Sequence, residues 1–229
     1  MLRNSLKRDS LNGSHFTDAE LVIVIGGDGT FLKTTHFNHD TPIFGINPSP
    51  KTKEGHLLQV GVDFEKQISA ILSGRYTTEN RARLEATING KPISEMALNE
   101  FYIGSEKPYM LFNYVLRAKG EAEFQRSSGI LIGTPSGTTA WLGSAGGKHM
   151  LPYEQAFQVI VREPYVGKLN PACSLRKLVL QKHEQVEILC KGEGILVTDS
   201  ISEEHILKSE DKVVIQLSKP LPYILPNIK

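Results

Sequence analysis

An apolar, largely β-branched run at residues 20–25 ends directly on two glycines, and this pattern narrows the architectures open to the N-terminal part of the chain. Such a continuous run is typical of a strand buried on both faces of a parallel sheet. Residues 42–47 form a second run of this kind, and residues 30–38 leave room for a short helix. A clearer helix covers 64–73 and is stopped by Gly74. The succession of strand, helix and strand predicts a parallel α/β unit.

The hydrophobic period then changes. From Arg81 onward, apolar residues alternate with polar ones up to the pair Asn89-Gly90, a strong signal for a tight hairpin turn. Further strands are predicted at residues 96–103, 110–119, 129–133, 177–181, 185–190, 194–198 and 212–217. We therefore predict an α+β fold, with an N-terminal α/β domain that contains a parallel sheet over residues 1–78 and an all-β C-terminal domain over residues 79–229.

Charge and cysteine content exclude several classes of protein. The 26 lysines and arginines are nearly balanced by 25 aspartates and glutamates, so no broad field would attract nucleic acid or an anionic membrane. No apolar run approaches the roughly 20 residues that cross a bilayer. Cys173 and Cys190 lack metal-type spacing and are expected to be reduced thiols, as in the cytoplasm. We therefore expect a cytoplasmic protein that binds a small molecule rather than nucleic acid or membrane.

The segment Gly26-Gly27-Asp28-Gly29-Thr30 connects the first predicted strand to the first predicted helix. Glycines here let a phosphate approach backbone N–H groups without a Cβ in the way. The start of the helix adds a partial positive charge that favours an anion. Asp28 is the one side chain of this loop that can accept a proton from a hydroxyl nucleophile. The alternative is a plain strand-to-helix turn in which Asp28 or Thr30 is the N-cap.

A second loop of small residues follows the predicted strand 129–133 and leads to Trp141. Its sequence is Thr134-Pro135-Ser136-Gly137-Thr138-Thr139-Ala140. The hydroxyls and free amides of such a loop would converge on a ligand beside the only tryptophan of the chain. Taken alone, Trp141 fits a core position better than a ligand platform. Two loops of this type in one chain nevertheless favour a ligand-binding protein over a coincidence of turns.

Asn99 and Glu100 stand next to each other inside the apolar run 96–103. At least one of the two must point to a mainly apolar side, where a buried amide or carboxylate needs a partner. A ligand with amino and hydroxyl groups would supply that partner. A strand-end turn or an internal hydrogen-bond network would do so as well.

In this order and at these separations, the three motifs resemble the signatures of the NAD kinase family over about residues 20–217. The chain resembles the mitochondrial-type branch of the family more than the common bacterial branch. The segments that carry this resemblance are residues 42–47, Glu54-Gly55-His56-Leu57, Ser127-Ser128-Gly129 and Arg162-Glu163-Pro164. Less chain precedes Gly26 than in the family, which has another strand and helix there. The expected consequence is a smaller N-terminal sheet, a sheet completed by a partner, or a weakened enzyme. Diacylglycerol and sphingosine kinases share only the first motif.

The resemblance implies an NAD kinase, a phosphotransferase that phosphorylates the adenosine 2'-hydroxyl of NAD to form NADP. ATP, or polyphosphate in its place, would be the donor, with Mg²⁺ bound mainly through the phosphates. The N-terminal domain would bind phosphate. The C-terminal domain would bind the dinucleotide and form a homodimer or homotetramer, in which a neighbouring subunit completes the site. The alternatives are a non-catalytic NAD-binding sensor and a lipid kinase that shares only the Gly26–Thr30 loop.

The resemblance also implies roles for single residues. Asp28 would be the general base, and the residues lining the phosphates would be Gly26, Gly27, Gly29 and Thr30. The residues implied for the NAD site are His56, Asn99, Glu100, Thr139, Ala140, Trp141, Ser144 and Asp199. Of these, Asn99 and Glu100 would hold adenine and ribose. Departures from the family pattern are Ser128 in place of a bacterial aspartate, Trp141 in place of tyrosine, and Ser200 after Asp199 in place of glycine or histidine.

Overall fold

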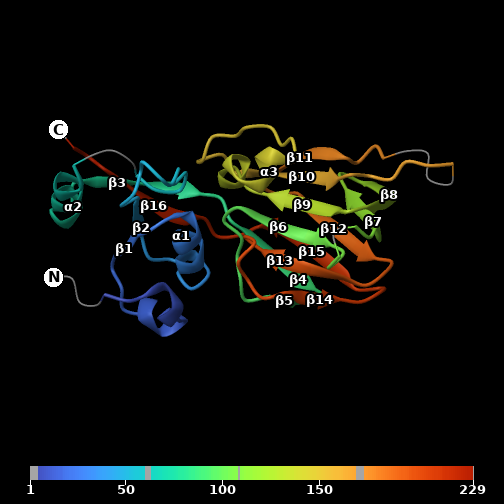
Figure 1. Ribbon diagram of the computed structural model, residues 1–229, viewed down its shortest axis with the longest axis horizontal. Coiled ribbons are helices and arrows are strands. Elements are labelled where there is room, and N and C mark those ends of the chain that lie inside the picture. The colour runs from blue at the N-terminus through green and yellow to red at the C-terminus, as the bar shows by residue number, and fades with distance from the viewer. Residues whose placement is uncertain (1–4, 60–62, 108, 169–172, 229) are drawn as a thin grey trace. The chain divides into compact units, whose positions relative to one another are not determined.

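The computed structural model describes residues 5–59, 63–107, 109–168 and 173–228 (Figure 1). The chain forms two compact units: the described residues up to Arg81 together with those from Pro220 on, and residues Ala82–Lys219. The expected boundary after residue 78 falls inside the strand β3 (Tyr76–Arg81). The prediction also placed the C-terminal segment in the second domain, whereas the last strand, β16 (Leu221–Pro226), joins the sheet of the first unit.

The sheet of the first unit has four strands in the order β1 (Val22–Ile25), β2 (Ile43–Ile46), β16 and β3. β1 and β16 both run parallel to β2, and β3 pairs antiparallel with β16. The sequence does not suggest β16, because Pro222 and Pro226 lack the N–H that a central strand needs. In the structure β16 pairs with β2 only at Tyr223 and takes most of its ladder from β3, which accommodates the prolines.

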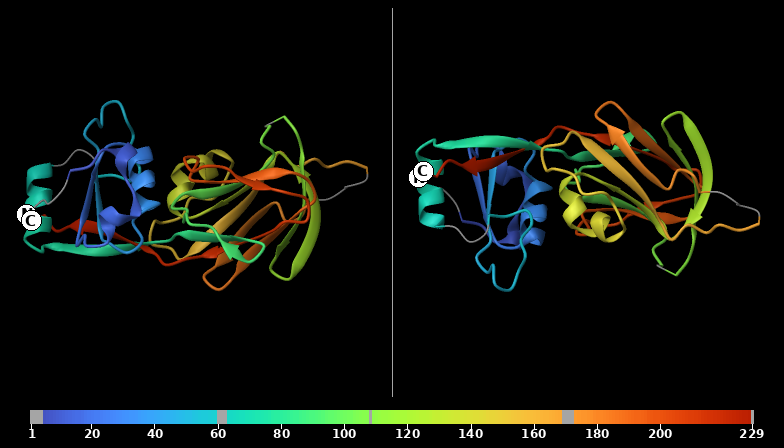
Figure 2. Two further views of the ribbon diagram at one scale, coloured as in Figure 1. Left: turned by 90° about the horizontal axis from the view of Figure 1, so that it is seen from below. Right: turned by 90° about the horizontal axis from the view of Figure 1, so that it is seen from above.

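Two helices, α1 (Asp28–Thr35) and α2 (Phe64–Leu72), lie on opposite faces of this sheet (Figure 2). Every residue of β2 is buried, so the prediction of a strand covered on both faces is confirmed there. The same prediction fails for β1, because β1 is the edge strand of the sheet and its Ile25 is 64% exposed. Two 3-10 turns precede β1, η1 (Arg8–Ser10) and η2 (Gly13–Phe16).

The second unit is a sandwich of two six-stranded antiparallel sheets, which Figure 2 shows as facing layers. One sheet has the order β11 (Lys177–Gln181), β10 (Ala156–Arg162), β9 (Gly129–Gly133), β6 (Glu100–Gly104), β13 (Gly194–Thr198) and β14 (His205–Leu207). The other has the order β5 (Lys91–Pro92), β4 (Leu84–Ile88), β15 (Lys212–Leu217), β12 (Gln185–Cys190), β7 (Phe112–Ala118) and β8 (Glu121–Ser127). Apolar side chains from both sheets form one core cluster. The predicted α+β fold is therefore confirmed.

The hairpin predicted at Asn89-Gly90 is present, and φ values of 53° and 77° at the two residues fit the left-handed turn that Asn-Gly favours. The run 96–103 becomes a strand only from Glu100 on. The sequence analysis does not predict β8 and β10. β8 is an edge strand of mostly polar residues, and six of the seven residues of β10 are buried, so neither shows the alternation expected of a half-buried strand.

Both cysteines are free thiols, as expected. Burial raises the pKa of the Cys190 thiol to about 12, so this side chain stays uncharged. Within the described ranges, no helix has the length and apolar character needed to cross a membrane.

Candidate active site

The glycine loop of the first unit joins β1 to α1 and is closed by backbone hydrogen bonds. The carbonyl of Gly27 accepts from the N–H groups of Thr30 at 2.9 Å and of Phe31 at 3.1 Å. Gly27 is the N-cap of α1, and no side chain of the described residues caps this end of the helix. The alternative in which Asp28 or Thr30 is the N-cap is therefore wrong.

The three glycines of the loop differ in whether the surrounding protein leaves room for a side chain. A Cβ on Gly26 would come within 2.9 Å of the Thr30 side chain, so packing inside the protein excludes a larger residue there. A Cβ on Gly27 would meet only Lys53 Cδ at 3.6 Å, and one on Gly29 only Arg8 Nη1 at 3.9 Å. Neither Gly27 nor Gly29 has a positive φ. The described part of the chain thus tolerates a methyl group at both positions, and the space beside the start of the helix stays open for an anion.

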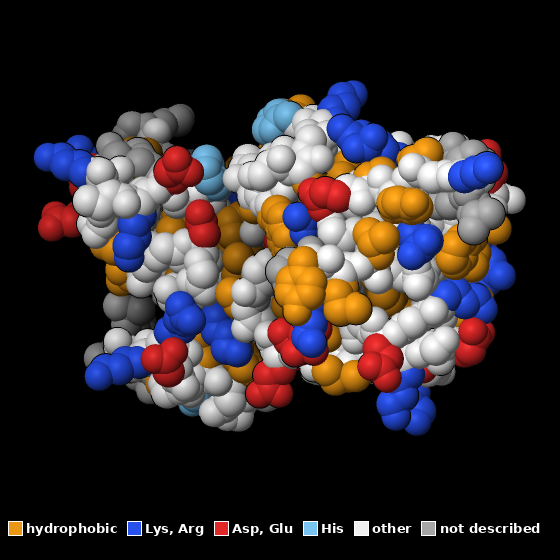
Figure 3. Space-filling view, turned by 45° about the vertical axis from the view of Figure 1, so that its right-hand side comes forward, with side chains coloured by type: hydrophobic (Ala, Val, Ile, Leu, Met, Phe, Trp, Pro, Cys, Tyr) orange, Lys and Arg blue, Asp and Glu red, His pale blue; other side chains and the backbone are white. Residues whose placement is uncertain are grey.

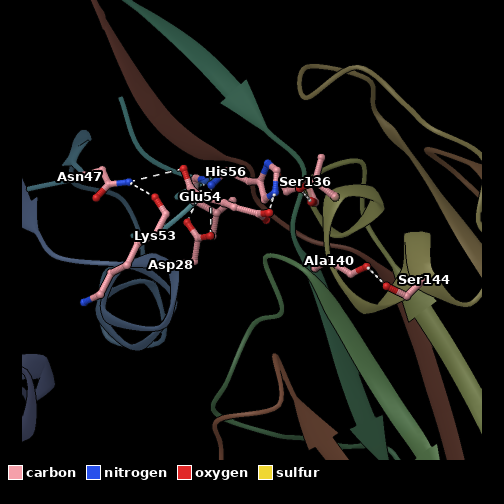
Figure 4. A network of polar contacts seen from close by, with 10 residues as sticks. Asp28, Asn47, Lys53, Glu54, His56, Ser136, Ala140 and Ser144 are labelled. Carbon is pink, nitrogen blue, oxygen red and sulfur yellow. Dashed lines mark hydrogen bonds and ion pairs between the residues drawn. The ribbon is translucent and has the colours of Figure 1, made fainter. Parts of the chain in front are cut away.

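The side chain of Asp28 hydrogen bonds to backbone outside its own helix. Its carboxylate accepts hydrogen bonds from the backbone N–H of His56 at 3.1 Å and of Leu57 at 2.9 Å (Figure 4). Each carboxylate oxygen has a further lone pair, so the group keeps acceptor capacity for a hydroxyl. Asp28 therefore both fixes the turn at residues 55–57 and retains the chemistry of a base.

The loop that follows β2 holds this turn in place. Buried Asn47 donates from Nδ2 to the carbonyl of Lys53 at 2.7 Å (Figure 4). Gly55 has φ of 67°, and a Cβ on it would lie 2.6 Å from the same Asn47 nitrogen, so only glycine fits. His56 is exposed and pairs with Glu54 at 2.9 Å. The sequence analysis did not single out Asn47 or Lys53. The available signal was a polar residue at the end of a buried strand.

In the second unit, Asp199 holds the start of β6. Its carboxylate accepts from the backbone N–H groups of Leu98 at 3.1 Å, Asn99 at 2.7 Å and Glu100 at 3.1 Å. Asp199 itself is 3% exposed and lies in the left-handed region at φ 52°, followed by Ser200 at φ 55°. The strained turn after β13 therefore positions the backbone of the Asn99-Glu100 pair.

Asn99 and Glu100 are both buried, at 7% and 3% exposure, and each has a side-chain oxygen that hydrogen bonds to no described residue. Burial, and then the negative charge of Asp199, raises the pKa of the Glu100 carboxyl to about 8. At neutral pH Glu100 is thus mainly protonated and can donate as well as accept. Buried groups of this kind are normally paired, so a ligand with hydroxyl and amino groups fits this position.

The small-residue loop packs directly on the Asn99-Glu100 pair. Thr134 donates from its N–H to the carbonyl of Asn99 at 2.9 Å, and a Cβ on Gly137 would lie 2.4 Å from that same carbonyl oxygen. The backbone of Leu142 lies near enough to the Glu100 carboxyl to lower its pKa slightly. The loop contains η3 (Ser136–Thr139) and α3 (Trp141–Ser144). It therefore forms one continuous site with Asn99 and Glu100.

The other residues predicted for the NAD site lie in this loop. Thr139 donates to the carbonyl of Ser136 at 3.0 Å, and Ser144 to that of Ala140 at 3.4 Å (Figure 4). Trp141 is half-buried and stacks on Tyr102, with 5.2 Å between the ring centroids. The guanidinium of Arg162 lies 4.8 Å from the indole. The tryptophan is thus held by its neighbours yet keeps part of its surface accessible.

The predicted site residues fall into two groups. The phosphate loop and His56 belong to the first unit, whereas the Asn99-Glu100 pair, the small-residue loop and Asp199 belong to the second. No cluster of three or more histidine, cysteine, aspartate or glutamate side chains suited to a metal occurs among the described residues.

Several known proteins are similar to this chain. A family model described as the ATP-NAD kinase C-terminal domain matches residues 98–225. A probable NADH kinase from Oryza sativa subsp. japonica is 29% identical over 245 residues, which cover 96% of this chain and 75% of that protein. An NAD kinase from Methanothermobacter thermautotrophicus is 33% identical over 207 residues, which cover 88% of this chain and 70% of that protein.

Two solved structures share the fold. A crystal structure of an NAD kinase from Archaeoglobus fulgidus in complex with ATP superposes with a TM-score of 0.72 at 24% identity, covering 92% of this chain and 78% of that one. Yeast NADH kinase complexed with NADH superposes with a TM-score of 0.73 at 19% identity, covering 91% of this chain and 63% of that one.

Proposed function

Because this chain belongs to the ATP-NAD kinase family, we propose that it transfers the γ-phosphoryl group of ATP to the adenosine 2'-hydroxyl of NAD, forming NADP and ADP. The observation that carries the proposal is the presence in one chain of two sites with complementary chemistry. One is a glycine loop with open space at Gly27 and Gly29. The other is a buried Asn99-Glu100 pair, in which each side chain has an oxygen that hydrogen bonds to no described residue. The first suits a phosphate chain, and the second suits a nucleoside with hydroxyl and amino groups.

In the proposed reaction the 2'-oxygen forms a bond to the γ-phosphorus while the bond from that phosphorus to the β,γ-bridging oxygen breaks. Asp28 accepts the 2'-hydroxyl proton, and ADP leaves with the electron pair of the broken bond. Gly26, Gly27, Gly29 and Thr30 line the phosphates. Mg²⁺ enters with ATP as part of the substrate and neutralises phosphate charge. Catalysis is then mainly positioning together with electrostatic stabilisation.

On the acceptor side, Asn99 and Glu100 hold adenine and ribose. The remaining residues proposed to line NAD are His56, Thr139, Ala140, Trp141 and Ser144. We assign Asp199 a positioning role, because its oxygens already accept three backbone N–H groups beside Asn99 and Glu100.

The proposed function is tested by incubating the protein with NAD, ATP and Mg²⁺ and measuring NADP. A parallel series with polyphosphate identifies the donor, and one with NADH shows whether the reduced dinucleotide is accepted. Binding of NAD without NADP formation from any donor would instead identify a sensor. Phosphorylation of a lipid in the absence of NAD would identify a lipid kinase.

We also propose that the active form is a homodimer or homotetramer. Several large apolar side chains of the second unit are exposed, among them Phe124, Tyr165 and Val166. Surfaces of this kind are common at subunit interfaces.

A cytoplasmic location is proposed as well. On the face shown in Figure 3, basic and acidic side chains are interspersed rather than collected by sign. That face offers no continuous basic surface to nucleic acid or to an anionic membrane.

The glycine loop supplies a matched pair of variants. Gly29→Ala should leave the free energy of unfolding unchanged or raise it by up to about 1 kcal/mol, because the residue is helical and no described atom crowds the added methyl. Its KM for ATP should rise at least about tenfold, because the methyl enters the phosphate space. Gly26→Ala should instead lower the melting temperature, because Thr30 occupies that space. Equal ATP affinity in Gly29→Ala and the unsubstituted protein would contradict the placement of the phosphates.

Trp141 reports on the acceptor site. As the only tryptophan, it should change its fluorescence when NAD is added, because it follows Thr139 and Ala140 in the loop that packs on Asn99. The same titration of an Asn99→Ala variant is the control and should give a much weaker response. An unaltered spectrum at saturating NAD would place the dinucleotide elsewhere.

A further inference from the structure

Lys53 lies over the glycine loop of the first unit. Its Cδ is 3.6 Å from the position that a Cβ on Gly27 would take, and its ammonium is two bonds farther along the side chain. Figure 4 shows this side chain extending beside the ribbon of α1. We propose that Lys53 contacts the donor: its ammonium binds the phosphate chain that lies on the Gly26–Thr30 loop. This assignment rests on the proposed kinase function and adds a residue to it.

The backbone around Lys53 is fixed on both sides. The carbonyl of Lys53 accepts from buried Asn47 at 2.7 Å, which ties it to the end of β2. Three and four residues later, the N–H groups of His56 and Leu57 bind Asp28 at the start of α1. The Cα of Lys53 is therefore held beside the loop before any ligand arrives. Only the outer bonds of its side chain need to be ordered on binding.

The charge of Lys53 is available to a ligand. Among the described residues, no acidic side chain pairs with its ammonium, and the neighbouring Glu54 pairs with His56 instead. A second cation, Arg8, reaches the other side of the loop, with Nη1 3.9 Å from the Cβ position of Gly29. Arg8 lies 3.7 Å from Asp9 in an exposed pair, which holds it weakly. An anion on the loop thus meets an uncommitted lysine, which binds phosphate as a point charge.

The test compares Lys53→Ala, Lys53→Arg and Lys51→Ala. Lys51 is an exposed lysine of the same loop, so its variant matches the loss of charge. Lys53→Ala should raise the KM for ATP about 10- to 100-fold, the range for a lost hydrogen bond to a charged group, and leave the KM for NAD unchanged. Lys53→Arg should restore most of the ATP affinity. Calorimetric titration with inorganic triphosphate should show the same loss in Lys53→Ala, because the contact is to phosphate and not to the base.

An ATP KM in Lys53→Ala equal to that in Lys51→Ala would overturn the assignment, as would a loss for ATP without a loss for inorganic triphosphate. The outcome is separable from failure of the kinase proposal. If the unsubstituted protein binds triphosphate but forms no NADP, the titrations alone still decide whether Lys53 contacts the phosphates.

Discussion

Asp28→Asn should lower turnover by about 10²- to 10⁴-fold, equivalent to roughly 3 to 5 kcal/mol of activation free energy. Asparagine keeps the size of the side chain but cannot accept the 2'-hydroxyl proton. The KM for NAD should change little, because Asn99, Glu100 and the small-residue loop carry the proposed NAD contacts. Steady-state rates of NADP formation at varied NAD and ATP measure both effects.

The hydrogen bonds of Asp28 make a control necessary. The N–H groups of His56 and Leu57 bind different carboxylate oxygens, and asparagine has an NH₂ group in place of one of them. Part of any loss can therefore come from movement of the turn. Gly55→Ala disturbs the same turn through its positive φ and its contact with Asn47, but leaves the carboxylate in place. Melting curves of both variants show whether they remain folded. If Gly55→Ala loses as much turnover as Asp28→Asn, Asp28 acts through the turn and is not the base.

The elements that the sequence predicts well are those whose pattern is local. The buried run of β2 and the Asn89-Gly90 hairpin follow from the residues themselves, and so does the strand-glycine-helix connection at Gly26 to Thr30. β16 is different, because its partner β3 is more than a hundred residues away in sequence and its two prolines argue against a strand. Which sheet a strand joins depends on long-range pairing, which local patterning does not encode.

The candidate site shows the same division. Glycines and adjacent buried polar residues stand out in a sequence, which is why Asp28, Asn99 and Glu100 could be proposed from it. The contacts that those residues make could not be predicted from the sequence. That Asp28 binds the amides of the 55–57 turn, and that Asp199 binds those at the start of β6, are pairings across 28 to 101 residues that only the folded chain reveals. The same holds for Lys53, an ordinary surface lysine until the fold places it over Gly27.

Glu100 should make the stability of the protein fall with rising pH. Its pKa is raised to about 8 in the folded state, above the ordinary value of 4.5, first by burial and then by Asp199. In the window from pH 5 to pH 8 the folded state therefore holds a proton that the unfolded state has lost, and folding weakens as pH rises. The slope is at most about 1.4 kcal/mol per pH unit, which amounts to about 4 kcal/mol over the window.

Glu100→Gln removes this titration while keeping both an acceptor and a donor for a ligand. Urea unfolding at several pH values should show the variant gaining stability relative to the unsubstituted protein from pH 5 to pH 8, with no further gain above that window. Glu121→Gln, the same change on the exposed edge strand β8, is the control and should leave the pH dependence as it was. Parallel stability curves for Glu100→Gln and the unsubstituted protein would mean that Glu100 is ionised in the folded state. It would then bind NAD only as an acceptor.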